Sequence, residues 1–386
     1  MSDARGRFHE VLNGVRQFGL TAEVASLEPL LHQVPDPTLQ GEIARLLGFY
    51  WLRQGDLDRA IGFSDLAADR LPHDHSSAYN AIFARFRRGA WDDAAERAKQ
   101  ALDRRGEHFE FCNLLSAALG ALGHLTEARR FGTRALELKE RQATAPARDL
   151  TAVAVPAFDA ATPARNVIAF SLFGAQTKYT QGALLNARVA QFLYPGWRCR
   201  FYVDGSVPSE TTQALLAEGA QVMTVGGMPN QPFGTFWRFL VADDPSVDRF
   251  VLRDADSLVN TRERVAVDDW IASGRHFHVM RDHFDHSELV LAGMWGGVRG
   301  ALPPMLPAIR AWYAARQRVI GATADQEFLR EALWPTIRQS VLTHDSQFAF
   351  GERRDFPALG SLPPDCWVGC DWGRMVPSKP GPSPFA

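Results

Sequence analysis

A repeat with a period of 34 residues is the feature that most limits what this chain can fold into. Three segments align without a gap: RQGDLDRA at 53–60, RRGAWDDA at 87–94 and ALGHLTEA at 121–128. A glycine fits the tight turn between two helices, and an alanine fits where two helices approach closely. The positions that recur are Gly55, Gly89 and Gly123, then Ala60, Ala94 and Ala128, and finally Ala67, Ala101 and Ala135. The period therefore predicts stacked pairs of antiparallel helices.

This spacing resembles the tetratricopeptide repeat over about residues 40–138, and a degenerate helix pair is expected before it, at about 8–34. The resemblance implies a concave surface that binds a peptide or protein partner. A scaffold or a dimerisation element is the alternative. We therefore assign residues 1–139 to an all-α helical-repeat domain similar to tetratricopeptide proteins.

The rest of the chain has a different pattern. Residues 140–165 are rich in alanine, proline and threonine and have no clear period, which is typical of a linker. From residue 166 onward, apolar strand segments alternate with amphipathic helices, so residues 166–359 are predicted to form an α/β domain with a mostly parallel sheet. The proline-rich stretch 360–386 is predicted to be an irregular tail.

Charge and composition exclude several classes of protein. The 42 basic and 44 acidic residues nearly balance, whereas a nucleic-acid surface needs a basic excess. No apolar run approaches the roughly 18 residues of a membrane span, and no signal peptide is expected from the polar N-terminus. Four scattered cysteines indicate neither a disulfide framework nor a zinc site, so a cytoplasmic protein is expected.

The segment Asp254-Ala255-Asp256 follows the apolar strand FVLR. Two carboxylates at this spacing, on a loop that leaves a buried strand, can bind one Mg²⁺ or Mn²⁺ ion, which prefers oxygen ligands and bridges to phosphate. The same spacing occurs at Asp56-Leu57-Asp58 in a repeat turn, where solvent exposure explains it. The position after a strand therefore favours a metal and diphosphate site at Asp254 and Asp256, with a loop cap as the alternative.

The order of motifs in this domain resembles the GT-A glycosyltransferases, particularly those similar to glycogenin and to bacterial lipopolysaccharide glycosyltransferases. The resemblance covers residues 166 to about 350 and implies a GT-A, Rossmann-like fold. It rests on a strand ending in Asp204, the pair Trp237-Arg238, the D-x-D loop, the strand LVLAGMWGGV at 289–298, the pair Asp325-Gln326 and a strand ending in His344.

The resemblance also implies roles for individual residues. Asp254, Asp256 and His344 would bind Mn²⁺ or Mg²⁺, and Asp325 and Gln326 would contact the transferred sugar. Gly296 and Gly297 would line the sugar or acceptor pocket, and Trp295 would be either an apolar wall for a sugar or a core aromatic. Residues of the first-strand loop and of neighbouring segments would hold the nucleotide, namely Phe173, Gly174, Lys178, Asp204, Arg238 and Arg253. Among them, Lys178, Arg238 or Arg253 would bind the phosphates.

Several of these positions have plain structural alternatives. His344 lacks the glycine and lysine that usually follow in the family. Arg238 could instead pair with Asp243 or Asp244, and Asp325 could be a helix N-cap. In the stretch FHVMRDHFDHSE, His283, Asp282 or Asp285 could bind acceptor hydroxyls or act as a base. Two alternatives for this stretch are a second metal centre built from imidazoles and carboxylates, and a solvated loop without a function.

Together these features predict a metal-dependent, hexosyltransferase-like glycosyltransferase. It would move a sugar from a nucleoside diphosphate sugar, with a UDP-sugar favoured, to a protein, peptide or glycan, while the repeats recruit the acceptor or a partner. A non-catalytic adaptor with a degenerate nucleotide-binding domain is one alternative. A nucleotidyltransferase is the other, although the loop FGAQTKYT lacks the glycine-rich basic character expected of one.

Overall fold

The computed structural model describes residues 2–228, 233–316, 323–358 and 366–375. The chain divides into two compact units, Met1–Leu138 and Lys139–Ala386. Within the described residues, no helix combines the length and apolar character that a membrane crossing requires.

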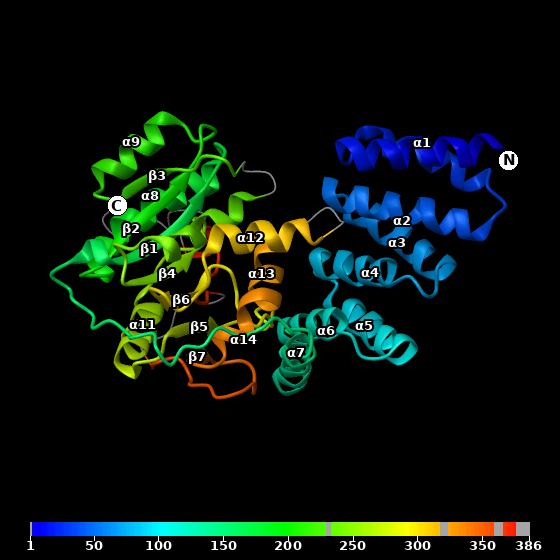
Figure 1. Ribbon diagram of the computed structural model, residues 1–386. Coiled ribbons are helices and arrows are strands. Elements are labelled where there is room, and N and C mark those ends of the chain that lie inside the picture. The colour runs from blue at the N-terminus through cyan, green and yellow to red at the C-terminus, as the bar shows by residue number, and fades with distance from the viewer. Residues whose placement is uncertain (1, 229–232, 317–322, 359–365, 376–386) are drawn as a thin grey trace, which may run out of the picture. The chain divides into compact units, whose positions relative to one another are not determined.

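The first unit is helical throughout, as the period predicts (Figure 1). Each turn glycine lies where the sequence places it, with φ of +83° at Gly55, +81° at Gly89 and +80° at Gly123. The alanines at 60, 94 and 128 are fully buried between helices. The helices are α1 (Ser2–Phe18), η1 (Ala22–His32), α2 (Pro37–Gln54), α3 (Leu57–Arg70), α4 (His75–Arg88), α5 (Trp91–Arg105), α6 (Phe109–Ala121) and α7 (Leu125–Glu140).

The turn that repeats the D-x-D spacing has a structural explanation. Asp56 is the N-cap of α3, and its Oδ1 accepts a hydrogen bond from the backbone N–H of Arg59 at 3.1 Å. The side chain of Asp58 is 73% exposed and pairs with Arg88 at the surface. This copy of the motif is therefore a capped, solvated helix start.

The second unit is built on a seven-stranded sheet in the order β3-β2-β1-β4-β6-β5-β7 (Figure 1). Strand β6 is antiparallel to both β4 and β5, whereas the other pairings are parallel. The sheet is thus mixed: a mostly parallel sheet was expected, and the parallel pairings lie on either side of the antiparallel strand β6. The strands are β1 (Asn166–Leu172), β2 (Arg198–Val203), β3 (Gln221–Thr224), β4 (Arg249–Arg253), β5 (Phe277–Arg281), β6 (Met294–Val298) and β7 (Val341–Asp345).

Helices and turns connect the strands, and most strands are buried along their length. Because β1, β2 and β4 are parallel, the loops that follow them meet at one edge of the sheet. The connecting elements are η2 (Pro163–Arg165), α8 (Thr177–Leu193), α9 (Ser209–Ala217), η3 (Gly234–Asp243), α11 (Thr261–Ser273), α12 (Met305–Ala314), α13 (Ala324–Phe328), η4 (Leu329–Leu333), α14 (Trp334–Ile337) and α15 (Trp372–Met375).

The segment 140–165 packs along the second unit mostly as turns and irregular chain. The backbone carbonyl of Val153 lies 2.7 Å from Nε2 of His276, and that of Pro156 accepts a hydrogen bond from Arg249 at 2.8 Å. These backbone contacts fix a stretch that has no hydrophobic period of its own.

Candidate functional site

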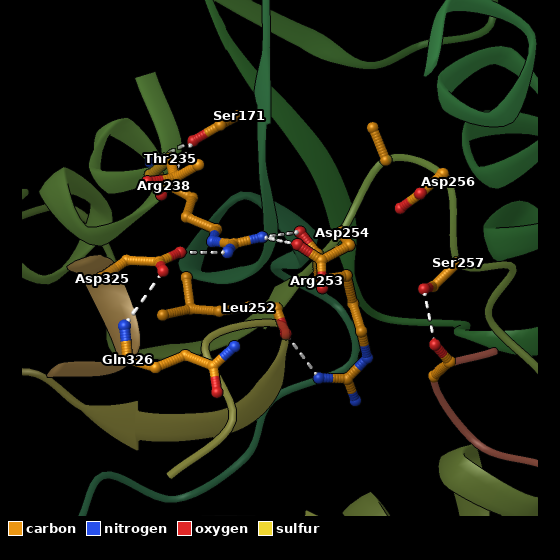
Figure 2. A network of polar contacts seen from close by, with 12 residues as sticks. Ser171, Thr235, Arg238, Leu252, Arg253, Asp254, Asp256, Ser257, Asp325 and Gln326 are labelled. Carbon is orange, nitrogen blue, oxygen red and sulfur yellow. Dashed lines mark hydrogen bonds and ion pairs between the residues drawn. The ribbon is translucent and has the colours of Figure 1, made fainter. Parts of the chain in front are cut away.

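An arginine at the centre of the site joins three separate segments of the chain. Element η3 carries Arg238, whose backbone N–H donates to Oγ of Ser171 on β1 at 3.0 Å. Its guanidinium donates from Nη1 to Asp254 in the loop after β4, and from Nη2 to Oδ2 of Asp325 on α13 at 2.9 Å. Figure 2 shows the guanidinium between these two carboxylates. The motifs that the sequence singled out therefore meet at one point.

The surface alternatives for Arg238 are excluded by the partners of the two nearby aspartates. Asp243 accepts hydrogen bonds from the backbone of Met305 at 2.7 Å, and Asp244 pairs with Arg200 at 2.7 Å. Only 3% of the Arg238 side chain is exposed.

Asp325 is held in an unusual electrostatic environment for a carboxylate. Burial and the neighbouring Asp254 raise its pKa to about 6, although Arg238 acts in the opposite direction. The N-cap position of α13 is occupied by Thr323, so Asp325 is not the cap of this helix. Its Oδ1 accepts from the backbone N–H of the half-buried Gln326 at 2.9 Å (Figure 2).

A second group of charges surrounds Asp256. Lys178, in the first turn of α8, places its Nζ 2.7 Å from Oδ2 of Asp256 and 2.9 Å from Oδ2 of Asp371. Burial works against the charged lysine, but the hydrogen bonds to both carboxylates raise its pKa above the usual value. The ammonium group of Lys178 therefore lies between two carboxylates that belong to distant parts of the chain.

The C-terminal segment 366–373 is the part of the site that the sequence analysis missed. Asp371 forms a β-bridge with Ser257, whose hydroxyl donates to the carbonyl of Gly369 at 2.9 Å. The backbone N–H of Trp372 donates to the carbonyl of Asp256 at 2.8 Å, and its indole N–H donates to the carbonyl of Lys178 at 2.9 Å. The predicted irregular tail therefore binds the D-x-D loop directly.

Two glycines allow the D-x-D loop to pack as closely as it does. A Cβ at Gly293 would lie 2.0 Å from Oδ2 of Asp254, and a Cβ at Gly182 would lie 2.2 Å from the carbonyl of Ala255. Neither position was predicted to belong to the site. Gly293 lies within the glycine-bearing segment that the sequence analysis identified, but its neighbours there gave no reason to choose it.

The loops after β1 and β2 also meet. The backbone N–H of Gly174, a residue with φ of +73°, donates to Oγ of Ser206 at 2.7 Å. Asp204 accepts from the backbone N–H of Ser206 at 3.0 Å. Phe173 packs edge-on against Trp237, with ring centroids 5.7 Å apart. The predicted nucleotide-binding residues of these loops are thus adjacent, and their role stays a prediction.

Two residues predicted to contact the donor or line its pocket belong to the core of the sheet, and so does Trp295, for which a core position was the alternative. The Arg253 side chain is 1% exposed and donates to Glu263 at 2.9 Å, pointing away from the D-x-D loop (Figure 2). Trp295 is completely buried against aromatic neighbours. A Cβ at Gly296 would lie 2.7 Å from the carbonyl of Phe250, so this glycine serves strand packing. These positions are corrected to structural ones.

His344 is not brought to the D-x-D loop. It lies on β7, which is separated from β4 by β6 and β5. Its ring is completely buried, with Nδ1 2.8 Å from Nε2 of His278 and Nε2 3.2 Å from Oδ2 of Asp269. Its assignment as the third metal ligand is therefore corrected, because the far edge of the sheet and the α11 carboxylate fix its position.

In the histidine-rich stretch 277–288, Asp282 is buried and His283 is partly exposed. Asp282 is buried, and its carboxylate accepts from Arg262 at 2.9 Å, from Ser346 at 2.6 Å and from the backbone N–H of Val368 at 3.0 Å. It anchors the C-terminal segment, and its role in binding acceptor hydroxyls or as a base stays a prediction. His283 remains partly exposed and stacks on Trp367, with ring centroids 3.8 Å apart.

Comparisons with known proteins are distant. No protein-family model and no curated protein matches the chain. Among solved structures, it is similar to a mutant O-GlcNAc transferase from Thermobaculum terrenum at 17% identity and a TM-score of 0.42, over 66% of this chain. The match spans 47%, about half, of that transferase.

Two other solved structures are similar to part of the chain. The first TPR domain of the human RPAP3 protein matches at 25% identity and a TM-score of 0.25, over 26% of this chain and 80% of that domain. MamA AMB-1 matches at 21% identity and a TM-score of 0.33, over 36% of this chain and 73% of that one. At these TM-scores, we base no functional conclusion on the likeness.

Proposed function

We propose that the second unit is a metal-dependent glycosyltransferase of the GT-A type, which uses a nucleoside diphosphate sugar and favours a UDP-sugar. The observation that supports this most is the joining of Asp254 and Asp325 by Arg238. The carboxylates implied for metal binding and for sugar binding lie on segments 71 residues apart, and a single buried guanidinium brings them together.

The side chains around the D-x-D loop offer ligand atoms that suit a hard divalent cation. Asp254, Asp256 and Asp371 offer carboxylate oxygens, the ligands that Mn²⁺ and Mg²⁺ prefer. The ammonium of Lys178 already lies between two of them, which indicates a position that favours positive charge. In this proposal Asp371 takes the place that the sequence analysis gave to His344. A bound cation would stabilise the charge that develops on a departing diphosphate.

The residues of the chain itself would position the donor. Lys178 lies in the first turn of α8, where the helix N-terminus adds partial positive charge that favours a phosphate group. Arg238 fixes the orientation of Asp254 and Asp325 before substrate arrives, so no reorganisation is needed at the moment of reaction. Asp325, with Gln326 beside it, would accept hydrogen bonds from hydroxyls of the transferred sugar.

The helical repeats would recruit a protein or peptide, as either the acceptor or a partner. This part of the proposal rests on the repeat architecture, which in other proteins presents a concave binding surface.

Donor binding is tested on the full chain by calorimetry with a panel of nucleoside diphosphates and their sugars, with and without Mn²⁺. We expect one nucleotide to bind in a Mn²⁺-dependent manner and Asp256→Ala to abolish that binding. Asp58→Ala is the matched control, because Asp58 ends the exposed copy of the same motif. If no nucleotide binds to a folded chain, the adaptor alternative gains and the proposed donor site is wrong.

A further inference from the structure

Two histidines and a glutamate converge in the helical-repeat unit, which the proposed transfer chemistry does not use. His75 is the first residue of α4, His108 is the N-cap of α6 and Glu110 lies in the first turn of α6. Helices α4 and α6 are the first helices of adjacent repeats and contact each other. The stacking of repeats therefore brings these side chains together from positions 33 and 35 residues apart.

The spacing of their polar atoms matches the reach of a metal ion. One ligand atom from each of the three residues lies within 4.8 Å of the other two. Oε2 of Glu110 lies 2.5 Å from Nε2 of His75 and 3.7 Å from Nδ1 of His108. Ligands of a tetrahedral zinc ion lie about 3.4 Å apart, given bonds of about 2.0–2.2 Å. Small changes in side-chain torsion would therefore bring all three atoms onto one ion.

The surroundings of this cluster favour a site with an open coordination position. His75 and Glu110 both line a cavity of about 310 Å³, together with Tyr79 and Asn80. The three side chains are between 36% and 37% exposed, so an ion from solvent can reach them. Three protein ligands beside a cavity leave the fourth position for water or for a group of a bound partner.

The charges nearby are compatible with a cation. The positive N-termini of α4 and α6 oppose it, but two carboxylates lie in the same region. Glu110 is one, and Asp74, the N-cap of α4, is the other. The rings of His75 and His108 have centroids 4.0 Å apart, so two imidazoles would repel if both were protonated. A shared metal ion would instead bind both imidazoles in the neutral form.

We propose that His75, His108 and Glu110 bind a divalent transition-metal ion of the zinc class, next to the cavity of the helical-repeat unit. Two imidazole nitrogens and one carboxylate suit Zn²⁺ or Co²⁺, whereas Mg²⁺ and Ca²⁺ prefer oxygen ligands alone. This site is independent of the D-x-D loop, since it shares no residue with it. It goes beyond the proposed sugar transfer.

The test uses the full chain, freed of metal with a chelator and titrated with Zn²⁺ in competition with a chromogenic chelator. We expect one tight equivalent in the unaltered chain and in Asp254→Ala/Asp256→Ala. The double variant His75→Ala/His108→Ala should lose that equivalent or bind at least about tenfold more weakly. Titration with Co²⁺ should give the intense visible absorption of a four-coordinate site in the unaltered chain and not in the double variant.

Two further variants keep the test decisive. His73→Ala/His124→Ala removes two exposed histidines from the same unit and should leave the tight equivalent unchanged. Glu110→Gln keeps the size of the side chain but removes its charge, and it should weaken Zn²⁺ binding while the helical circular dichroism stays the same. If the His75/His108 double variant, still helical, binds Zn²⁺ as tightly as the unaltered chain, the proposal is wrong.

Discussion

The guanidinium of Arg238 donates to the carboxylate of Asp325 across 2.9 Å, and 3% and 5% of these two side chains are exposed. This contact connects η3 to α13 across 87 residues of sequence. A charged pair buried this far from water contributes little net stability when it is intact, but removing one partner leaves a charge without compensation. The pair therefore fixes the geometry of the site, and losing either partner should destabilise the second unit.

Removing the arginine should destabilise the second unit strongly. Arg238→Leu leaves Asp325 buried without its cation, and the free energy of unfolding should fall by about 3–5 kcal/mol. Urea unfolding followed by tryptophan fluorescence measures the loss. Arg188→Leu is the control, because Arg188 pairs with Glu218 at the surface and its loss should cost no more than about 1 kcal/mol. Equal losses in the two variants would contradict a buried role for Arg238.

The sequence was sufficient for the parts of the fold that local patterns encode. The 34-residue period placed Gly55 and Gly89 in their turns, because a left-handed turn selects glycine. The resemblance in motif order singled out Arg238, Asp254 and Asp325, and ion pairs through Arg238 join them in the folded chain, while their role in binding a donor stays a prediction.

Positions decided by tertiary packing could not be predicted in this way. His344 does end a strand, but the order of strands in the sheet places β7 at the far edge, beside β5. Asp371 lies in a stretch without period, and its place at the site depends on a β-bridge to Ser257. Only the neighbours of each glycine in the folded chain separate Gly293, at the site, from Gly296, in the core.

The two glycines should give different results when each is replaced by alanine. In Gly293→Ala the new methyl group meets Oδ2 of Asp254 at 2.0 Å, so the carboxylate must move. We expect Mn²⁺-dependent nucleotide binding to fall by about tenfold or more, with a smaller loss of stability. In Gly296→Ala the methyl group meets the backbone of Phe250 at 2.7 Å. Overpacking there should cost about 1–3 kcal/mol.

Calorimetry and urea unfolding of both glycine variants separate these effects. The Gly296→Ala chain, where it remains folded, should bind the nucleotide as the unaltered chain does. If Gly293→Ala binds normally, the position of Asp254 does not control the donor site.

Removing the lysine next to the D-x-D loop should strengthen the binding of the metal alone. The ammonium of Lys178 lies between Asp256 and Asp371 and competes with a divalent ion for their oxygens. In Lys178→Met, the affinity for Mn²⁺ without nucleotide should rise by about tenfold, equal to about 1.4 kcal/mol. Electron paramagnetic resonance of free Mn²⁺ measures this change.

A matched variant checks that the gain is local. Lys99→Met removes an exposed lysine from α5 and should leave the Mn²⁺ affinity unchanged. A fall in affinity in Lys178→Met would show that the lysine supports the metal site instead of competing for it.

The raised pKa of Asp325 should make the stability of the second unit depend on pH in a direction opposite to that of most carboxylates. Burial is the main cause of the shift, from 3.8 to about 6. Between these values the folded chain keeps the proton and the unfolded chain releases it. Stability contributed by this group is therefore present below about pH 4 and is lost as the pH rises through about 6.

Asp325→Asn isolates this contribution, because an amide of similar shape does not titrate. Relative to this variant, the unaltered chain should lose on the order of 2–3 kcal/mol of unfolding free energy between about pH 4 and pH 7. Urea unfolding of both chains at matched pH values measures the difference, and Gln326→Ala should retain the slope because it keeps the carboxyl group. If the difference between the two chains does not change with pH, the pKa of Asp325 is the same in the folded and the unfolded chain. The pair with Arg238 would then offset the effect of burial on this carboxylate.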